Sequence, residues 1–225
     1  MPKAARSPED IESIKERILD VALSIINDQG FEHFSMRKLA AKLGITATTI
    51  YNYYSSKDEL YLMILTRGFG LLSSTLHDIQ QNVQDPFLRL EAMIRAYVDF
   101  GIRDSNYYNI MFTSGAPKYL DYVGTDLEPI AFFEKQTALQ LLEITSREFS
   151  HTVHGNCHLA EEDIRYFVIR LWSSLHGIIA LYNSRVLHEV HEHPETMVER
   201  MVSDLVSSFQ EIVGNPARSP LRQDD

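Results

Sequence analysis

The chain has 225 residues, a net charge of −10 and 44% hydrophobic residues. A chain of this length can fold without disulfides or metals, and its single cysteine, Cys157, cannot form an internal disulfide. No apolar run approaches the roughly 18 residues of a membrane span, and the polar N-terminus lacks the apolar core of a signal peptide. We therefore expect one or two domains, no membrane span and a cytoplasmic location.

The negative charge is unevenly distributed along the chain. Affinity for nucleic acid comes largely from cations that replace the counterions around phosphates, so a charge of −10 argues at first against DNA binding. Between Ser35 and Lys57, however, the charged residues are four cations and no carboxylate, and Lys3 and Arg6 add two cations in the N-terminal tail. A basic segment on an acidic chain would confine DNA to one surface.

The first helix is predicted from its start and stop signals. Apolar residues recur at three-and-four spacing along almost the whole chain, and alternation typical of strands is scarce, so we predict an all-α fold. Ser7 is expected to cap the first helix and Pro8 to occupy its first position. Gly30 is expected to end it.

Two short helices and a long one should follow. Ser35 and Thr46 are suitable caps for the short helices, and Gly44 suits the left-handed turn between them. Ser56 to Glu59 matches the capping box S-x-x-E, which predicts a long helix from Lys57 through about Ile79.

The later elements are predicted in the same way, from caps, prolines and apolar spacing. The expected helices cover residues 86–103, 106–112, 126–149, 161–186 and 195–213. We expect a connecting stretch at residues 115–124, a polar loop at residues 151–158 and a frayed tail from residue 215.

The most specific pattern lies between Gly30 and Leu60. It consists of Gly30, the stretch from Ser35 to Ile45, the sequence Thr49-Ile50-Tyr51, and Lys57. Two short helices joined at a glycine, the second presenting Thr and Tyr, are typical of a helix-turn-helix. In order, spacing and residue type, residues 14–65 resemble the DNA-binding domain of the TetR family, with Ser35 where Thr is usual.

The resemblance implies DNA contacts for individual side chains. Arg37 would read a base edge, which for a bidentate contact with guanine discriminates by about 1–3 kcal/mol. Five other residues would hold phosphates and so position the protein rather than select sequence, namely Ser35, Thr46, Thr48, Tyr51 and Lys57. Tyr53 occupies a position that would also face DNA. The expected DNA-binding residues are Ser35, Arg37, Thr46, Thr48, Thr49, Tyr51, Tyr53 and Lys57. The alternative is that much of the pattern, including Leu39, Ile50 and Tyr54, is the packing that any three-helix domain needs.

The C-terminal part carries a weaker resemblance. The stretch from Leu171 to Gly177 is similar to the Trp-x-x-x-His-Gly sequence of one subgroup of TetR-type C-terminal domains. The resemblance implies that the last two helices pair with those of a second copy. The expected interface residues are Ile169, Trp172, Leu175, Ile179, Met197, Met201, Leu205 and Phe209. The alternative is that they belong to the core of a single chain.

The middle of the chain is rich in aromatic residues and predicts a ligand site. Such a lining, with few charges, suits a mainly apolar or planar effector. The expected ligand-binding residues are Phe69, Phe100, Tyr107, Tyr108, Phe112, Phe133, Trp172 and His176, and Tyr97 and Phe132 lie in the same aromatic segments. The alternative is that these rings fill the core.

Gly68 and Gly70 interrupt the long helix that should join the two parts. Each glycine costs up to about 1 kcal/mol relative to alanine in a helix interior, so a hinge is one interpretation. Close approach of a neighbouring helix is the other.

Other chemistries find little support. The sequence His188-Glu189-Val190-His191 is one residue short of the zinc-binding HExxH, and neither a Walker loop nor a G-x-S-x-G motif is present. We therefore predict a protein that is not an enzyme and needs no cofactor or metal. A helical metal-binding or interaction protein without specific DNA binding is the alternative.

The patterns and the resemblance together predict a regulator of transcription. We predict a repressor that binds palindromic operator DNA as a homodimer and is released by a small, mainly apolar effector. Residues 8–60 would form the DNA-binding domain, residues 61–214 the effector-binding and dimerisation domain, and residues 215–225 the tail.

Overall fold

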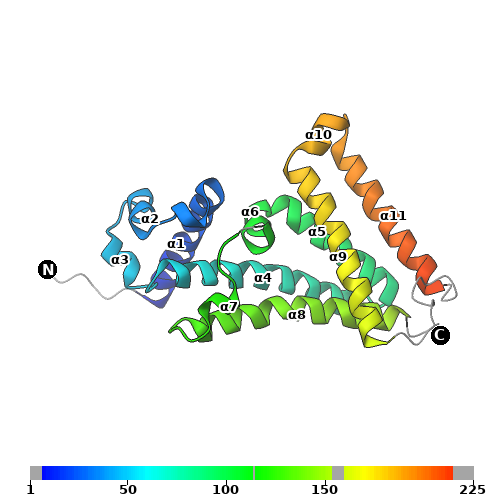
Figure 1. The fold of residues 1–225 in the computed structure, drawn as a ribbon, viewed down its shortest axis with the longest axis horizontal. Coiled ribbons are helices and arrows are strands. Elements are labelled where there is room, and N and C mark those ends of the chain that lie inside the picture. Colours follow the sequence, from blue (N-terminus) through cyan, green and yellow to red (C-terminus); the bar gives the residue numbers. More distant parts are fainter. Residues whose placement is uncertain (1–6, 114, 154–159, 215–225) are drawn as a thin grey trace. The chain divides into compact units, whose positions relative to one another are not determined.

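The computed structural model describes residues 7–113, 115–153 and 160–214, and their regular structure is entirely helical (Figure 1), which confirms the all-α prediction. In chain order the helices are α1 (Pro8–Gln29), α2 (Met36–Leu43), α3 (Ala47–Tyr51), α4 (Lys57–Asn82), α5 (Pro86–Arg103), α6 (Ser105–Tyr108), α7 (Tyr119–Tyr122), α8 (Glu128–Val153), α9 (Glu161–Asn183), α10 (Val186–Val190) and α11 (Pro194–Gly214). A 3-10 turn, η1 (Phe31–His33), follows α1, and a π-helical segment, η2 (Asn109–Thr113), follows α6.

The described residues form two compact units. Unit 1 comprises the residues up to Gly70 together with Asn106–Ala138, and unit 2 comprises Leu71–Ser105 and the residues from Leu139 onward. Both α4 and α8 contribute to each unit. The compact units therefore do not follow the boundary expected at residue 60, and the division into DNA-binding and effector-binding domains stays a prediction. The expected tail lies outside the described residues.

The local signals at helix ends act as expected. Ser7 Oγ accepts a hydrogen bond from the backbone of Asp10, whose carboxylate accepts one from Ser7, which completes a capping box. Gly30 ends α1 with a φ of 81°, and Gly44 ends α2 with a φ of 69°. Both angles lie in the left-handed region that glycine adopts without steric cost.

The start of α4 differs from the expected capping box in one contact. Ser56 Oγ accepts a hydrogen bond from the backbone of Glu59, as predicted. The Glu59 carboxylate instead accepts from the backbone and hydroxyl of Ser55, at 2.6 and 2.5 Å. The helix still begins at Lys57, because the Ser56 hydroxyl satisfies the amide of Glu59 in the first turn.

Several boundaries in the C-terminal half were predicted wrongly. Helix α8 continues to Val153, into the segment expected to be a loop, whose remaining residues lie outside the described part. Helix α9 stops at Asn183, and Arg185 has a φ of 63° before the unpredicted α10. The connecting stretch contains the short α7. No glycine or proline follows Asn183 directly, so the end of α9 has no stop signal in the sequence.

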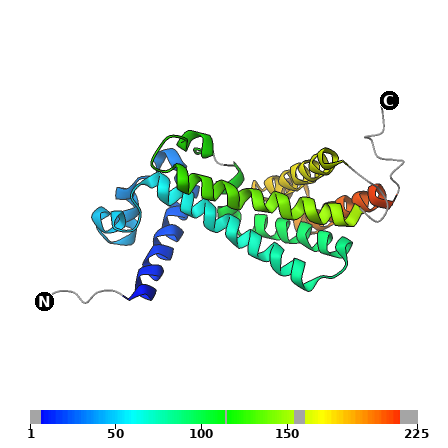
Figure 2. The ribbon, with the colours of Figure 1, turned by 90° about the horizontal axis from the view of Figure 1, so that it is seen from below.

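In unit 1, α1, α2 and α3 share a small apolar core. Ile18, Leu39 and Ile50 are almost completely buried, and Tyr54 is buried beside them. These are the positions that a three-helix domain needs for packing. A second cluster joins Leu62 of α4, Tyr122 of α7 and Ala131 of α8. The first turns of α8 accordingly run beside α4 in both views (Figures 1 and 2).

In unit 2, α9 packs against α5 and α11. A Cβ atom on Gly101 would lie 2.6 Å from Ile179, so the glycine allows α5 and α9 to approach closely. Phe149 contacts the rings of Phe167 and Phe209, both at centroid distances of 5.7 Å. Such ring pairs add to the stabilisation from burial alone.

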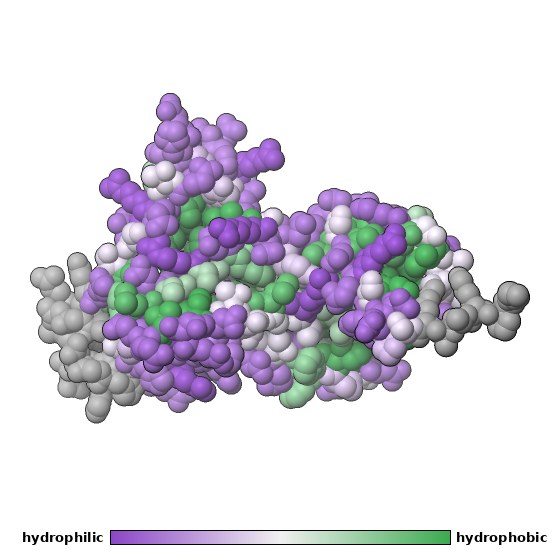
Figure 3. All heavy atoms as spheres, turned by 180° about the vertical axis from the view of Figure 1, so that it is seen from behind, coloured by the Kyte–Doolittle hydropathy of each residue, from purple (hydrophilic) through white to green (hydrophobic). Residues whose placement is uncertain are grey.

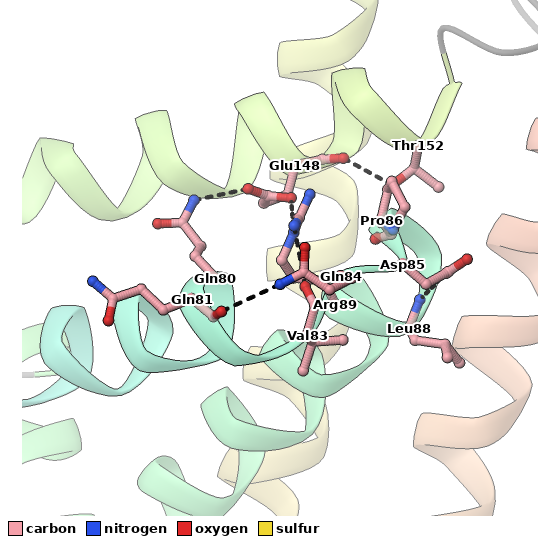
Figure 4. A network of polar contacts seen from close by, with 10 residues as sticks. All are labelled: Gln80, Gln81, Val83, Gln84, Asp85, Pro86, Leu88, Arg89, Glu148 and Thr152. Carbon is pink, nitrogen blue, oxygen red and sulfur yellow. Dashed lines mark hydrogen bonds and ion pairs between the residues drawn. The ribbon is translucent and has the colours of Figure 1, made fainter.

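A buried ion pair also holds unit 2 together (Figure 4). Glu148 of α8 is buried, and its carboxylate accepts hydrogen bonds from Arg89 Nε at 2.5 Å and from Gln80 Nε2 at 2.7 Å. Arg89 also donates to the carbonyl of Val83 in the α4–α5 turn. Because both carboxylate oxygens are bonded, the cost of removing this charge from water is offset by specific contacts.

Among the described helices, only α9 is long and apolar enough to cross a membrane, with a mean hydropathy of 1.2 over its most apolar 18 residues. Length and composition alone are weak evidence, because a core helix passes the same test. Phe167, Leu171 and Leu175 of α9 are buried inside the chain.

On the face drawn in Figure 3, apolar patches interrupt a mostly hydrophilic surface.

Candidate DNA-binding and ligand-binding sites

The helix-turn-helix is held in place by its own caps and core. Ser35 Oγ accepts from the backbone of Lys38 at 3.3 Å, and Thr46 Oγ1 accepts from the backbone of Thr49 at 3.2 Å. The Ile45 amide bonds to the Ala40 carbonyl across the glycine turn. These contacts fix the direction in which α3 leaves the turn, as a recognition helix requires.

The predicted DNA-binding residues all retain some exposure. Arg37, Thr46, Thr48 and Tyr51 are exposed, and Tyr51 shows 52% of its surface. The remaining four, which are Ser35, Thr49, Tyr53 and Lys57, are partly exposed. The side chains are therefore accessible on α2, α3 and the start of α4, while their DNA contacts stay a prediction.

The cations of the basic segment are in different situations. Lys38 Nζ donates to Gln29 Oε1 at 2.9 Å and to the carbonyl of His33 at 2.8 Å. Lys42 Nζ donates to Ser24 Oγ, and Lys57 Nζ lies 4.5 Å from the centre of the Phe31 ring. Counting charges in the sequence could not reveal these contacts.

Arg37 differs from these lysines. Its side chain is exposed on α2 and has no ion pair or hydrogen bond within the described part of the chain. A guanidinium in this position can bind a base edge or phosphate without first breaking a contact.

The helix-turn-helix unit is tied to α4 by an exposed ion-pair network. Arg67 donates to Asp20 at 2.7 Å and reaches Glu16 at 2.9 Å, both on α1. Its guanidinium also lies 5.8 Å from the Tyr107 ring centre. Sequence reasoning missed this link, because its members are separated by more than 40 positions.

Five of the predicted ligand residues lie in unit 1. Phe112 contacts Phe69 edge-on at a ring distance of 5.7 Å and Tyr108 at 5.3 Å. Phe69, Tyr107 and Tyr108 are buried, whereas Phe133 is 62% exposed on α8. Three of the five are therefore buried in unit 1, Phe112 is partly exposed and Phe133 lies at the surface, while their contacts with a ligand stay a prediction.

The two glycines of α4 are not equivalent. A Cβ on Gly68 would lie 2.6 Å from Met111 Sδ and 2.9 Å from the Tyr107 ring, so this glycine allows a close approach. A Cβ on Gly70 would meet nothing within 4 Å. Packing therefore explains Gly68 but not Gly70.

The other three predicted ligand residues lie in unit 2, where two of them meet Tyr97. Trp172 Nε1 donates to the Tyr97 hydroxyl at 2.5 Å, and this hydroxyl lies 3.2 Å from His176 Nε2. Tryptophan can only donate, so the Tyr97 oxygen accepts from Trp172, and the direction of its bond with His176 depends on the tautomer of the ring. Burial lowers the pKa of His176, which favours the neutral ring. Phe100, which follows Tyr97 on α5, is also buried.

The predicted interface residues divide into two groups. Leu175, Ile179 and Phe209 are buried in their own chain. Ile169 is 48% exposed and Trp172 38% exposed on α9. Met197, Met201 and Leu205 are partly exposed on α11. These last five residues keep exposed apolar surface, while their contact with a second copy stays a prediction.

A metal centre finds no support in the described residues. No group of three or more His, Cys, Asp or Glu side chains in them could hold an ion. His191 Nδ1 instead accepts a hydrogen bond from the backbone of His193. His154, Cys157 and His158 lie outside the described residues.

An all-helical chain with a capped helix-turn-helix and a larger helical part defines the class of helical DNA-binding regulators. Residues 18–64 match the family model "Bacterial regulatory proteins, tetR family", and residues 90–205 match "Tetracyclin repressor-like, C-terminal domain". The chain belongs to the TetR family of DNA-binding transcriptional regulators.

Characterised relatives agree with this assignment. The chain is 31% identical over 96 residues to the transcriptional activator FasR of Mycolicibacterium smegmatis. This alignment covers 43% of the chain and 44% of FasR. The chain is 24% identical over 181 residues to the regulator BetI of Cronobacter sakazakii. This alignment covers 76% of the chain and 82% of BetI. The first match thus spans less than half the length of the relative.

Solved structures share the fold. The crystal structure of AibR in complex with isovaleryl coenzyme A and operator DNA matches with a TM-score of 0.62 and 18% identity. The match covers 85% of this chain and 97% of AibR.

Proposed function

We propose that the chain is a homodimeric repressor that binds palindromic operator DNA and is released by a small, mainly apolar effector. The observation that carries the proposal is the exposed row of polar side chains on α2 and α3, with Arg37 lacking a partner in the described part of the chain. Arg37 would read a base, and Ser35, Thr46 and Tyr51 would hold phosphates.

The dimer is inferred from function and from surface composition. One helix-turn-helix reads a short half-site, so two copies must present their recognition helices about 34–36 Å apart. The exposed Ile169 and Trp172 and the partly exposed Met201 are apolar side chains that a second copy would cover.

The effector is inferred from the aromatic residues of the middle helices. AibR, whose fold the chain shares, was solved with both an acyl coenzyme A and operator DNA. A protein of this fold can therefore hold both kinds of partner. The regulator would act in the cytoplasm and without enzymatic turnover.

Selection of DNA from a random pool with the purified full chain tests the proposal. We expect a palindromic winner whose binding weakens with salt by a slope of about 0.9 per phosphate contact. Arg37→Ala and Tyr51→Phe should weaken binding to this winner, while Arg103→Ala, an exposed arginine of unit 2, should not. If the pool yields no preferred sequence, the proposal fails and the alternative of an interaction protein without specific DNA binding is favoured.

The direction of regulation needs its own measurement, because FasR is an activator. A reporter gene placed behind the selected operator should be silenced by the wild-type chain. An increase in reporter output would assign activation instead.

A further inference from the structure

Unit 1 contains a cleft that the proposed function does not use. It has a volume of about 640 Å³ and lies where the end of α1 and η1 face η2 and the segment after it. Its lining residues are Ile26, Asn27, Gly30, Phe31, Glu32, His33, Asn109, Ile110, Gly115 and Ala116. A cleft of this size is within the range of about 300–1,000 Å³ typical of small-molecule sites.

The cleft has an apolar floor and a polar rim. Ile26, Phe31, Ile110 and Ala116 are buried, and they supply the apolar surface. Glu32 and His33 are exposed at the rim. This arrangement suits a molecule with an apolar body and one polar end.

The polar groups at the rim favour a hydrogen-bond donor. Asn27 Nδ2 donates to the carbonyls of Leu23 and Asn106, both at 3.0 Å, so its amide protons are already used and its oxygen is left to accept. Glu32 brings a carboxylate, and the described lining includes neither lysine nor arginine. The nearby Lys38 is held by Gln29 and the His33 carbonyl. Asn27 Oδ1 and the Glu32 carboxylate are therefore acceptors that a ligand could meet, and Glu32 is the one Asp, Glu, Lys or Arg side chain in the described lining.

Two walls of the cleft have unusual backbone. Asn109 and Ile110 belong to the π-helical η2, and such segments occur often at functional sites. Gly30, with its φ of 81°, opens η1 on the other side. The Asn27–Asn106 bond joins the two walls.

We propose that this cleft binds an organic amine with an apolar body, its ammonium group at Glu32 and its body on Phe31 and Ile110. The site is separate from the aromatic cluster of Phe69, Tyr108 and Phe112. It lies within the unit that carries the helix-turn-helix, and its η1 wall holds Lys38 of α2 through the His33 carbonyl. Binding at this site requires neither DNA nor the effector of the proposed function.

Calorimetric titration of the full chain with a pair of isosteres tests the proposal. The amine probe is biphenyl-4-ylmethanamine, and the matched anion is biphenyl-4-carboxylate. We expect uptake of the amine and none of the carboxylate. Glu32→Gln should weaken amine binding about tenfold, because a charge-assisted hydrogen bond is lost. Asp28→Asn, which removes an exposed carboxylate outside the lining, should change it less than twofold.

Filling the cleft gives a second test. Ala116→Leu should reduce amine uptake, and unchanged DNA affinity or an unchanged circular dichroism melting curve would show that this variant is folded. Equal uptake of the two isosteres, no uptake of the amine, or equal losses in Glu32→Gln and Asp28→Asn would each overturn the proposal. Because no DNA is present in the titration, these results are independent of the operator experiment.

Discussion

Neighbouring cations on α2 show how much the surroundings of a residue matter. Arg37 is exposed without a partner in the described part of the chain, whereas Lys38 bonds to Gln29 and to the backbone of η1. Sequence reasoning counted both as positive charge available to DNA. Only the position of α1 and η1 relative to α2 distinguishes the exposed guanidinium of Arg37 from the bonded ammonium of Lys38.

The two residues should therefore respond differently to truncation. Arg37→Ala should weaken binding to the selected operator about 5- to 150-fold without changing stability. Lys38→Ala should lower the free energy of unfolding by about 0.5–1 kcal/mol, since it loses two partly solvated hydrogen bonds. Urea unfolding and fluorescence anisotropy with labelled operator measure the two effects. A stability loss in Arg37→Ala equal to that in Lys38→Ala would contradict this division.

Glu134 is a buried carboxyl whose effect on stability should depend on pH. Burial raises its pKa, and the charge of Lys118 only partly offsets this. A raised folded-state pKa means that the folded protein binds more protons than the unfolded chain. Stability is therefore full below the ordinary carboxyl pKa and falls as pH rises through the folded value.

Glu134→Gln removes this penalty. We expect its melting temperature to exceed that of the wild type by at least about 2 °C at pH 7.5 and to match it near pH 4. Glu143→Gln, an exposed glutamate on the same helix, serves as the control. A stability gain that is the same at both pH values would refute the titration argument.

At the scale of elements, α4 is the helix whose two glycines the structure distinguishes. Gly68 lies against Met111 and Tyr107, and Gly70, the last residue of unit 1, has open space where its Cβ would be. The hinge interpretation therefore rests on Gly70 alone. The close-approach interpretation accounts for Gly68.

Single substitutions separate the two interpretations. Gly68→Ala should destabilise the protein, because its methyl group would overlap Met111 and Tyr107. Gly70→Ala should gain up to about 1 kcal/mol of helix stability and, if the helix bends there, reduce the release of operator by effector. Thermal melting and effector titration of the DNA complex measure these outcomes. An unchanged effector response in Gly70→Ala would exclude the hinge.

At the scale of the whole molecule, the exposed apolar face of α9 bears on assembly. Ile169→Glu places a charge where a second copy is expected to pack. In light scattering we therefore expect this variant to have the 25.9 kDa mass of a single chain and the wild type to have twice that mass. Leu120→Glu, at a position 80% exposed in unit 1, is the control and should leave the dimer intact. A dimeric Ile169→Glu would place the interface elsewhere.

The sequence by itself determined the all-α class, most helix starts and the helix-turn-helix, because their signals lie within about four residues of the structure that they produce. Ser7, Ser35 and Thr46 cap as expected, and Gly30 and Gly44 adopt the turns that glycine favours. The family resemblance carried by this segment was likewise confirmed.

Only the tertiary structure decided which predicted site residues meet. The bond from Trp172 to Tyr97 joins residues 75 positions apart, and the ion pair of Arg67 with Asp20 joins residues 47 apart. Phe69 and Phe133 have the same apolar character in the sequence, yet one is buried and the other exposed. Burial depends on which helices pack together, and residue type alone does not specify this.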